Sequence, residues 1–177
     1  MFLNQEGSLL FIIDVQEKLL NAIFNKDLVL KNAKILAKAA NILSLPIVVT
    51  EQYPQGLGES IEGLKENATV FEKVAFNALN DESLLDELKM YGKNQIIILG
   101  IETHICVYQT AVALLNNGFN VTVASDACGS RSEYEYNVAL ANLKDYGAKI
   151  KTTEMVLFEL LKTAKHPNFK EIQALIK

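Results

Sequence analysis

The feature that most constrains the fold is a repeated alternation of short apolar runs with amphipathic stretches of helical length. Residues 95–99 are rich in isoleucine and show no polar alternation, which is typical of a strand buried on both faces. Residues 26–45 instead place their apolar side chains on one helical face, and Pro46 ends the pattern. Strands that alternate with helices in this way predict an α/β protein, with a parallel sheet covered by helices on both sides.

The same pattern extends along the whole chain. Further strands are predicted at residues 9–13, 47–50, 70–71, 121–124 and 149–152. Further helices are predicted at residues 81–91, 132–146, 154–164 and 168–176, and between residue 106 and a stop at Gly118. Because the 177 residues contain no repeat and no linker-like segment, we expect one domain over residues 1–177.

Charge and cysteine content argue against several classes of protein. Lys and Arg number 17 against 21 Asp and Glu, and they are spread singly, so no basic patch for nucleic acid is expected. The sequence has no bilayer-length apolar run and no secretory signal, and two cysteines do not make a disulfide framework. We therefore expect a cytoplasmic protein that binds a small molecule, and neither nucleic acid nor a membrane.

The residues that follow the predicted strands are the candidates for a functional site, because ligands of such sheets bind beyond the carboxyl ends of the strands. Asp14 follows the first strand, and Lys73 follows the third. Cys106 lies at the start of the helix after strand 95–99. The three side chains together could form a site in which Asp14 accepts the thiol proton and Lys73 stabilises the thiolate.

Each of these residues also has a structural explanation when taken alone. Asp14 could cap a helix, Lys73 could be solvated, and Cys106 could be a buried, inert thiol. The position of Cys106 near a helix N-terminus and a lysine predicts instead a lowered thiol pKa.

Histidine is scarce, since only two are present, so a Cys–His pair would have to use one of them. His104 is two residues from Cys106, and side chains at that spacing do not face each other on a helix, which favours a helix-start or subunit-contact role. Cys128 is predicted to be structural or a bystander near the site, and Asp126 to cap or hold the loop after its strand.

Four segments together resemble the isochorismatase-like family of cysteine hydrolases. They are FIIDVQ (11–16), VFEK (70–73), GIETHICVYQT (100–110) and SDACGSR (125–131), in the family's order, within a match from about residue 8 to 158. A fifth segment, TEQYPQGLG (50–58), is similar to a subgroup of isochorismatase-domain proteins.

The resemblance implies a three-layer α/β/α fold with a six-stranded parallel sheet of order 3-2-1-4-5-6, which makes strands 1 and 4 neighbours. It assigns a catalytic triad to Asp14, Lys73 and Cys106. It also implies a cis peptide before Glu102, which would aim the amides of Glu102 and Cys106 at an oxyanion.

Departures from the family narrow the expected activity. Isochorismatases proper lack the cysteine, so hydrolysis of isochorismate is not expected. Nicotinamidases hold a metal through histidines after strand 2, and residues 51–58 contain none, so no metal or other cofactor is expected. Gln52, Tyr53 and Phe76 are predicted to line the substrate pocket.

The function predicted from these residues is cleavage of an amide-type C–N bond of a small molecule through a thioester on Cys106. The alternative is a scaffold protein that keeps the fold without activity. A ribonuclease is a third, weaker hypothesis, because the chain is acidic. A homo-oligomer, a dimer or larger, is expected, with residues 155–161 as either an interface or a core helix.

Overall fold

The structure, a computed structural model, describes residues 2–177. Six parallel strands form one sheet of order β3-β2-β1-β4-β5-β6, which confirms the expected order. The strands are β1 (Ser8–Ile13), β2 (Ile47–Gln52), β3 (Ala68–Lys73), β4 (Gln95–Ile101), β5 (Asn120–Gly129) and β6 (Lys149–Lys151).

Helices connect the strands and cover the sheet. They are α1 (Glu17–Leu20), α2 (Lys26–Ile42), α3 (Pro54–Leu57), α4 (Glu82–Met90), α5 (Tyr108–Asn116), α6 (Glu133–Asp145), α7 (Thr153–Leu161) and α8 (Phe169–Leu175). A 3₁₀ turn, η1 (Ala78–Asn80), precedes α4, and a π-helical turn, η2 (Thr103–Val107), leads into α5. Between residues 2 and 177, no helix is both long and apolar enough to cross a membrane.

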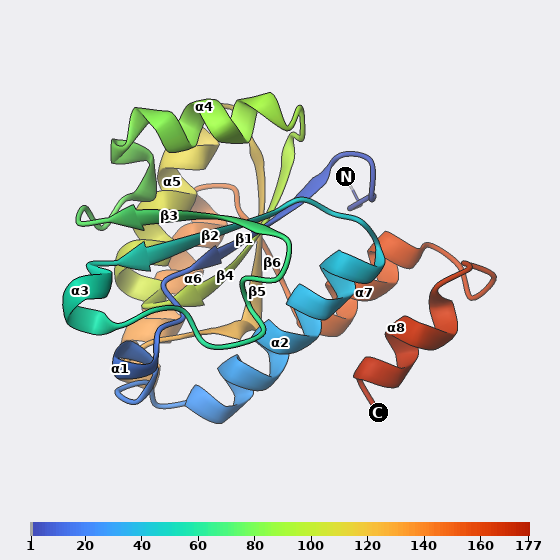
Figure 1. Ribbon diagram of the computed structural model, residues 1–177, viewed down its shortest axis with the longest axis horizontal. Helices are drawn as coiled ribbons and strands as arrows, with labels where there is room; N and C mark the ends of the chain where they lie inside the picture. Colours follow the sequence, from blue (N-terminus) through green and yellow to red (C-terminus); the bar gives the residue numbers. More distant parts are fainter. Residues whose placement is uncertain (1) are drawn as a thin grey trace.

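The helices form a layer on each face of the sheet. Helices α2, α7 and α8 contribute to one buried apolar cluster, and α4, α5 and α6 contribute to the other. Figure 1 shows α4 and α5 above the sheet and α2, α7 and α8 below it. The arrowheads of β1, β2 and β3 point toward one edge, where α1 and α3 lie, so the carboxyl ends of these strands meet there.

Strand β1 illustrates why the central strands read as continuously apolar. Leu10 and Ile12 belong to the cluster under α2 and α7, whereas Leu9, Phe11 and Ile13 belong to the cluster under α4 and α5. All five side chains are at most 1% exposed. Burial on both faces therefore removes the polar alternation that a half-exposed strand would show.

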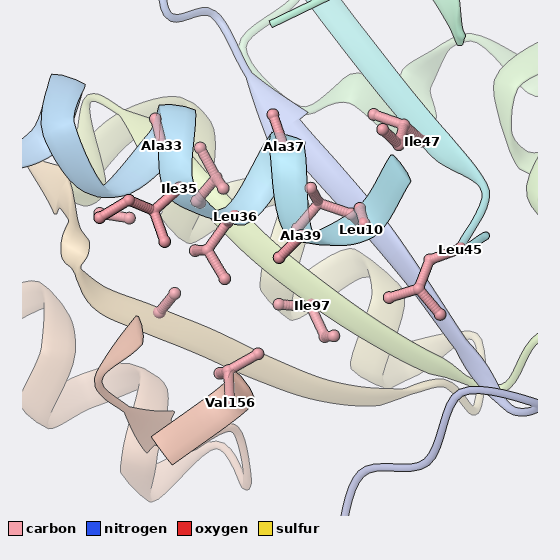
Figure 2. Packing of buried hydrophobic residues seen from close by; sticks show 14 of the residues in the cluster. Leu10, Ala33, Ile35, Leu36, Ala37, Ala39, Leu45, Ile47, Ile97 and Val156 are labelled. Atoms are coloured by element: carbon pink, nitrogen blue, oxygen red, sulfur yellow. The ribbon is translucent and has the colours of Figure 1, made fainter. Parts of the chain in front are cut away.

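The α2 side of the core is built from side chains of the sheet and of the helix layer formed by α2, α7 and α8. Figure 2 shows Leu10, Ile47 and Ile97 from three neighbouring strands along α2, in one cluster with Leu36 of α2 and Val156 of α7. Burial of large aliphatic side chains contributes roughly 1.5–3 kcal/mol each. This core fixes the positions of β1, β2 and β4, and thereby the positions of the polar side chains that follow them.

The order of the strands changes direction at β1, which has β2 on one side and β4 on the other. Gly100 in β4 adopts a φ of +137°, and a Cβ at this position would lie 2.0 Å from the carbonyl oxygen of Ile13. Only glycine therefore allows β4 to approach the end of β1 this closely. The close approach brings the turn after β4 next to the residue after β1.

Candidate active site

Asp14 follows the last residue of β1 and is fully buried, with a φ of 53°. Its Oδ1 accepts a hydrogen bond of 2.8 Å from Thr50 Oγ1, and its Oδ2 accepts one of 2.6 Å from Lys73 Nζ. Helix α1 begins after Gln16 and has no side-chain cap. The alternative that Asp14 caps a helix is therefore wrong, because its carboxylate binds β2 and β3 side chains instead.

Lys73 is the last residue of β3, and its side chain is only 4% exposed. Besides the ion pair with Asp14, its ammonium donates to Gln52 Oε1 at 2.6 Å and to the Ala75 carbonyl at 3.2 Å. The alternative of a solvated lysine is wrong. A buried ammonium with three acceptors is held at one point next to a buried carboxylate, which is the pairing that burial of either charge requires.

Cys106 lies in η2, directly before α5, and is 6% exposed. The N–H groups of Ile105 and Val107 both donate to the Glu102 carbonyl, at 3.1 and 3.2 Å. This wide turn places the thiol at the N-terminal end of the helical segment, beside Asp14 and Lys73, whose charges both act on it.

The electrostatic environment of the thiol differs from the one expected from sequence. Burial, together with the Asp14 carboxylate, raises the pKa of Cys106 to about 12, and the Lys73 ammonium opposes the shift. The expected lowering of the thiol pKa is therefore wrong, because desolvation outweighs the cation. At neutral pH the group is a thiol, and a reaction at sulfur requires a base to remove its proton.

Glu102 precedes η2, and the peptide bond between Ile101 and Glu102 is cis. The Glu102 carboxylate accepts hydrogen bonds from the backbone N–H and the Nε of Arg131, at 3.1 and 2.9 Å. The loop after β5 thus holds the turn that carries the Glu102 and Cys106 amides, the two groups expected to bind an oxyanion.

A cavity of about 420 Å³ adjoins Lys73. Its lining includes Tyr53, Lys73, Ala75 and Ala78. Tyr53 is 53% exposed and has a left-handed backbone, with a φ of 38°, at the start of α3. Tyr53 therefore lies at the surface, in the lining of the same cavity as Lys73.

The other two residues expected in the pocket are placed differently. Phe76 is 54% exposed and is not among the residues that line this cavity. Gln52 uses both ends of its side-chain amide within the protein, since Oε1 accepts from Lys73 and Nε2 donates to the Val74 carbonyl at 2.6 Å.

Two polar residues of this region were missed from the sequence. Thr50, fully buried in β2, donates to Asp14. Gln16, also fully buried, binds the backbone of Gln52. Thr50 could have been identified because it is a polar residue at the carboxyl end of a buried strand, and the neighbouring strand is followed by the candidate acid Asp14.

The remaining candidates have contacts within the fold. His104 Nδ1 lies 3.0 Å from Ser130 Oγ, and Ser130 is fully buried. Cys128 is fully buried in β5, opposite Gly100, and burial raises its pKa to about 12. Asp126 accepts hydrogen bonds from Thr153 N and Oγ1, at 2.7 and 2.9 Å, and so caps the start of α7.

Helix α7 is a core helix that also exposes two apolar side chains. Val156, Leu157 and Leu160 are buried, whereas Met155 and Phe158 are 49% and 43% exposed.

Within residues 2–177, no group of three or more His, Cys, Asp or Glu side chains is placed to hold a metal ion.

The fold and the site define a class: a doubly wound α/β protein with a carboxylate, an ammonium and a thiol gathered where the strand order reverses. The sequence pattern of the isochorismatase domain matches residues 8–155. The chain belongs to the isochorismatase-like hydrolase family.

Relatives and solved structures agree with this membership. The chain is 42% identical to isochorismatase family protein 1A of Dictyostelium discoideum over 178 residues, which covers 96% of this chain and 86% of that protein. It is 38% identical to a structure described as the MAR1 ribonuclease of Caenorhabditis elegans, with a TM-score of 0.93 over 99% of this chain and 92% of that one. It is 25% identical to the YcaC gene product of Escherichia coli, described as an octameric hydrolase of unknown specificity, with a TM-score of 0.90 over 98% and 95% of the two chains.

Proposed function

We propose that the chain is a metal-independent cysteine hydrolase that cleaves the C–N bond of a small amide through a thioester on Cys106. The observation that carries the proposal is a buried Asp14 carboxylate, held by Lys73 and Thr50, next to a thiol whose pKa is raised to about 12. A protonated thiol needs a neighbouring base, and Asp14 is the carboxylate whose charge acts on it.

The proposed reaction has two steps. As the Cys106 sulfur attacks the amide carbon, Asp14 takes the thiol proton and passes it to the leaving nitrogen, so the C–N bond breaks and an amine departs. A water molecule then attacks the thioester, and Asp14 takes one of its protons. The carboxylic acid product leaves, and the sulfur regains a proton.

The negative charge that develops on the carbonyl oxygen needs hydrogen-bond donors. The backbone amides of Glu102 and Cys106, at the start of η2, are the proposed donors. Removing one such donor from an enzyme of this type typically costs about 100-fold to 1,000-fold in rate. The contacts between Glu102 and Arg131 support this role, because they hold the turn from its outer side.

The decisive experiment uses the two cysteines as a matched pair. Wild type, Cys106→Ala and Cys128→Ala are tested with a panel of small amides and with p-nitrophenyl acetate, an activated ester that acylates nucleophiles. We expect acetylation of Cys106 in the wild type, and no turnover by Cys106→Ala. Cys128→Ala should retain activity, since Cys128 is fully buried away from solvent.

Undiminished turnover by Cys106→Ala would falsify the proposed mechanism. Activity that disappears after treatment with a chelator, and returns with a divalent metal, would contradict a metal-independent reaction. A protein that neither turns over any amide nor accepts the acetyl group would support the scaffold alternative.

A ribonuclease is the second candidate, favoured by the description of the structure from Caenorhabditis elegans. The net charge of −4 argues against tight binding of RNA. A labelled RNA oligonucleotide belongs in the same panel. Cleavage of RNA that Cys106→Ala abolishes would favour this candidate over the amidase.

We also propose that the chain forms a homo-oligomer, because the YcaC gene product is described as octameric and the exposed Met155 and Phe158 offer apolar surface on α7. Light scattering coupled to size exclusion measures the assembly. A monomer at all concentrations would contradict this part of the proposal.

A further inference from the structure

The hydrogen-bonding capacity of Lys73 is fully used inside the protein. An ammonium has three N–H donors. Those of Lys73 have three acceptors, namely Asp14 Oδ2 at 2.6 Å, Gln52 Oε1 at 2.6 Å and the Ala75 carbonyl at 3.2 Å. Lys73 therefore has no donor left for a substrate. Apart from its charge, which acts on the Cys106 thiol, its effect on the reaction passes through the carboxylate that it holds.

Gln52 is the only side chain other than Asp14 among those acceptors. The orientation of its amide is fixed from both ends, because Nε2 donates to the Val74 carbonyl at 2.6 Å while Oε1 faces the ammonium. The opposite orientation would place an NH₂ group against the Lys73 ammonium and an oxygen against a carbonyl oxygen.

The backbone of Gln52 is held as firmly as its side chain. Gln16 is fully buried, and its Oε1 accepts from the Gln52 N–H at 2.8 Å while its Nε2 donates to the Gln52 carbonyl at 3.0 Å. The N–H of Gln16 in turn donates to the Asp14 carbonyl at 2.8 Å. The contacts form a closed circuit from Asp14 through Lys73, Gln52 and Gln16 back to Asp14.

We infer that Gln52 is a positioning residue, which fixes the Lys73 ammonium on Asp14 and does not contact substrate. The inference rests on the proposed function, because it assigns Gln52 a role in keeping Asp14 in place as the base for Cys106. Its essential atom is Oε1, the acceptor for Lys73, whereas the donor to Val74 only orients the amide.

Four variants test the inference, with acylation of Cys106 by p-nitrophenyl acetate as the readout. Gln52→Met keeps the size of the side chain and removes the acceptor, Gln52→Glu keeps an acceptor, and Asp14→Asn removes the proposed base. Gln5→Met is the matched control, because Gln5 also donates to a carbonyl, that of Leu160, but precedes β1, whereas Asp14 follows the other end of that strand. Thermal unfolding of each variant shows that it is folded.

We expect Gln52→Met to lower the acylation rate constant at saturating ester by at least about tenfold, as a small displacement of a reacting group does. The ester concentration at half saturation should not rise. Gln52→Glu should stay within about threefold of wild type, because the charge-assisted bond to Lys73 remains. Gln5→Met should match wild type.

If Asp14→Asn is acylated slowly, three results would overturn the inference and leave the proposed function in place. The first is a folded Gln52→Met that acylates as fast as wild type. The second is a Gln52→Met whose half-saturation concentration rises at an unchanged rate constant, which is the behaviour of a substrate contact. The third is a folded Gln52→Glu as slow as Gln52→Met, which would assign the effect to the Val74 contact. If Asp14→Asn acylates normally, the proposed base and this inference both fail.

Discussion

The ammonium of Lys73 and the carboxylate of Asp14 lie 2.6 Å apart, with side chains that are 4% and 0% exposed. Neither group has solvent to stabilise it if the other is removed. The pair comes from the ends of β3 and β1, on either side of β2. Removal of one partner is therefore expected to destabilise the fold strongly, even where the intact pair adds little net stability.

We predict that Lys73→Met lowers the free energy of unfolding by about 3–5 kcal/mol, because it leaves a buried carboxylate without its counter-charge. Urea unfolding followed by circular dichroism measures the change. Lys93→Met is the control, since Lys93 donates one exposed hydrogen bond to the Glu6 carbonyl, and should change stability by no more than about 0.5 kcal/mol. Equal stabilities of the two variants would contradict burial of the pair.

The raised thiol pKa predicts a specific dependence of stability on pH. In the unfolded chain Cys106 loses its proton near the ordinary thiol pKa of 9.0, whereas in the folded protein, where its pKa is raised to about 12, it keeps the proton to higher pH. Between these values the unfolded state binds fewer protons, so the free energy of unfolding falls as pH rises. The slope for one such thiol approaches about 1.4 kcal/mol per pH unit.

Unfolding free energies measured from pH 8 to pH 10.5 test this dependence. Cys106→Ala should show a shallower decline than wild type. Cys128→Ala should do the same, because burial also raises the pKa of Cys128 to about 12. A decline that is as steep in Cys106→Ala as in wild type would show that the thiol ionises equally in both states.

The close approach of β4 to β1 predicts a strong effect of Gly100→Ala. Its Cβ would lie 2.0 Å from the Ile13 carbonyl oxygen, so β4 must move and the thiol-bearing turn with it. We expect loss of acylation and a Tm lowered by many degrees, or failure to fold. Gly92→Ala is the control: its φ is +64° with no atom within 4 Å of the added Cβ, so it should cost only about 1–2 kcal/mol. Similar behaviour of both variants would contradict the role given to Gly100.

The sheet was predictable because burial on both faces leaves an unmistakable apolar run in β1 and β4. The residues at which the strands end were harder to predict. Strand β5 was expected to end at Ala124, where Ser125 and Asp126 interrupt the apolar pattern, but it continues to Gly129. Those two polar side chains are bonded to distant residues, Ser125 to the Lys151 carbonyl and Asp126 to Thr153, and such contacts leave no trace in local sequence.

At the site, the positions of Asp14, Lys73 and Cys106 could be predicted from sequence, because Asp14 and Cys106 follow strands and Lys73 ends one. The balance between burial and charge that sets the pKa of the thiol could not be predicted in this way. A helix start and a lysine argue for a lowered pKa, whereas the depth of Cys106 below the surface decides the opposite direction. Depth depends on the packing of η2 against the sheet, which no local pattern encodes.

Strand β1 lies between β2 and β4, and β2 is synthesised before β4, so one edge of β1 can pair before the other. A nascent chain that ends just after Lys73 already contains both charges of the ion pair, but the flank of β1 that β4 will occupy is still bare. An unpaired strand edge attracts other chains, so a chain at this stage is exposed to aggregation. Residues 95–106 cover that edge and supply the thiol together, so a chain that ends before β4 has neither.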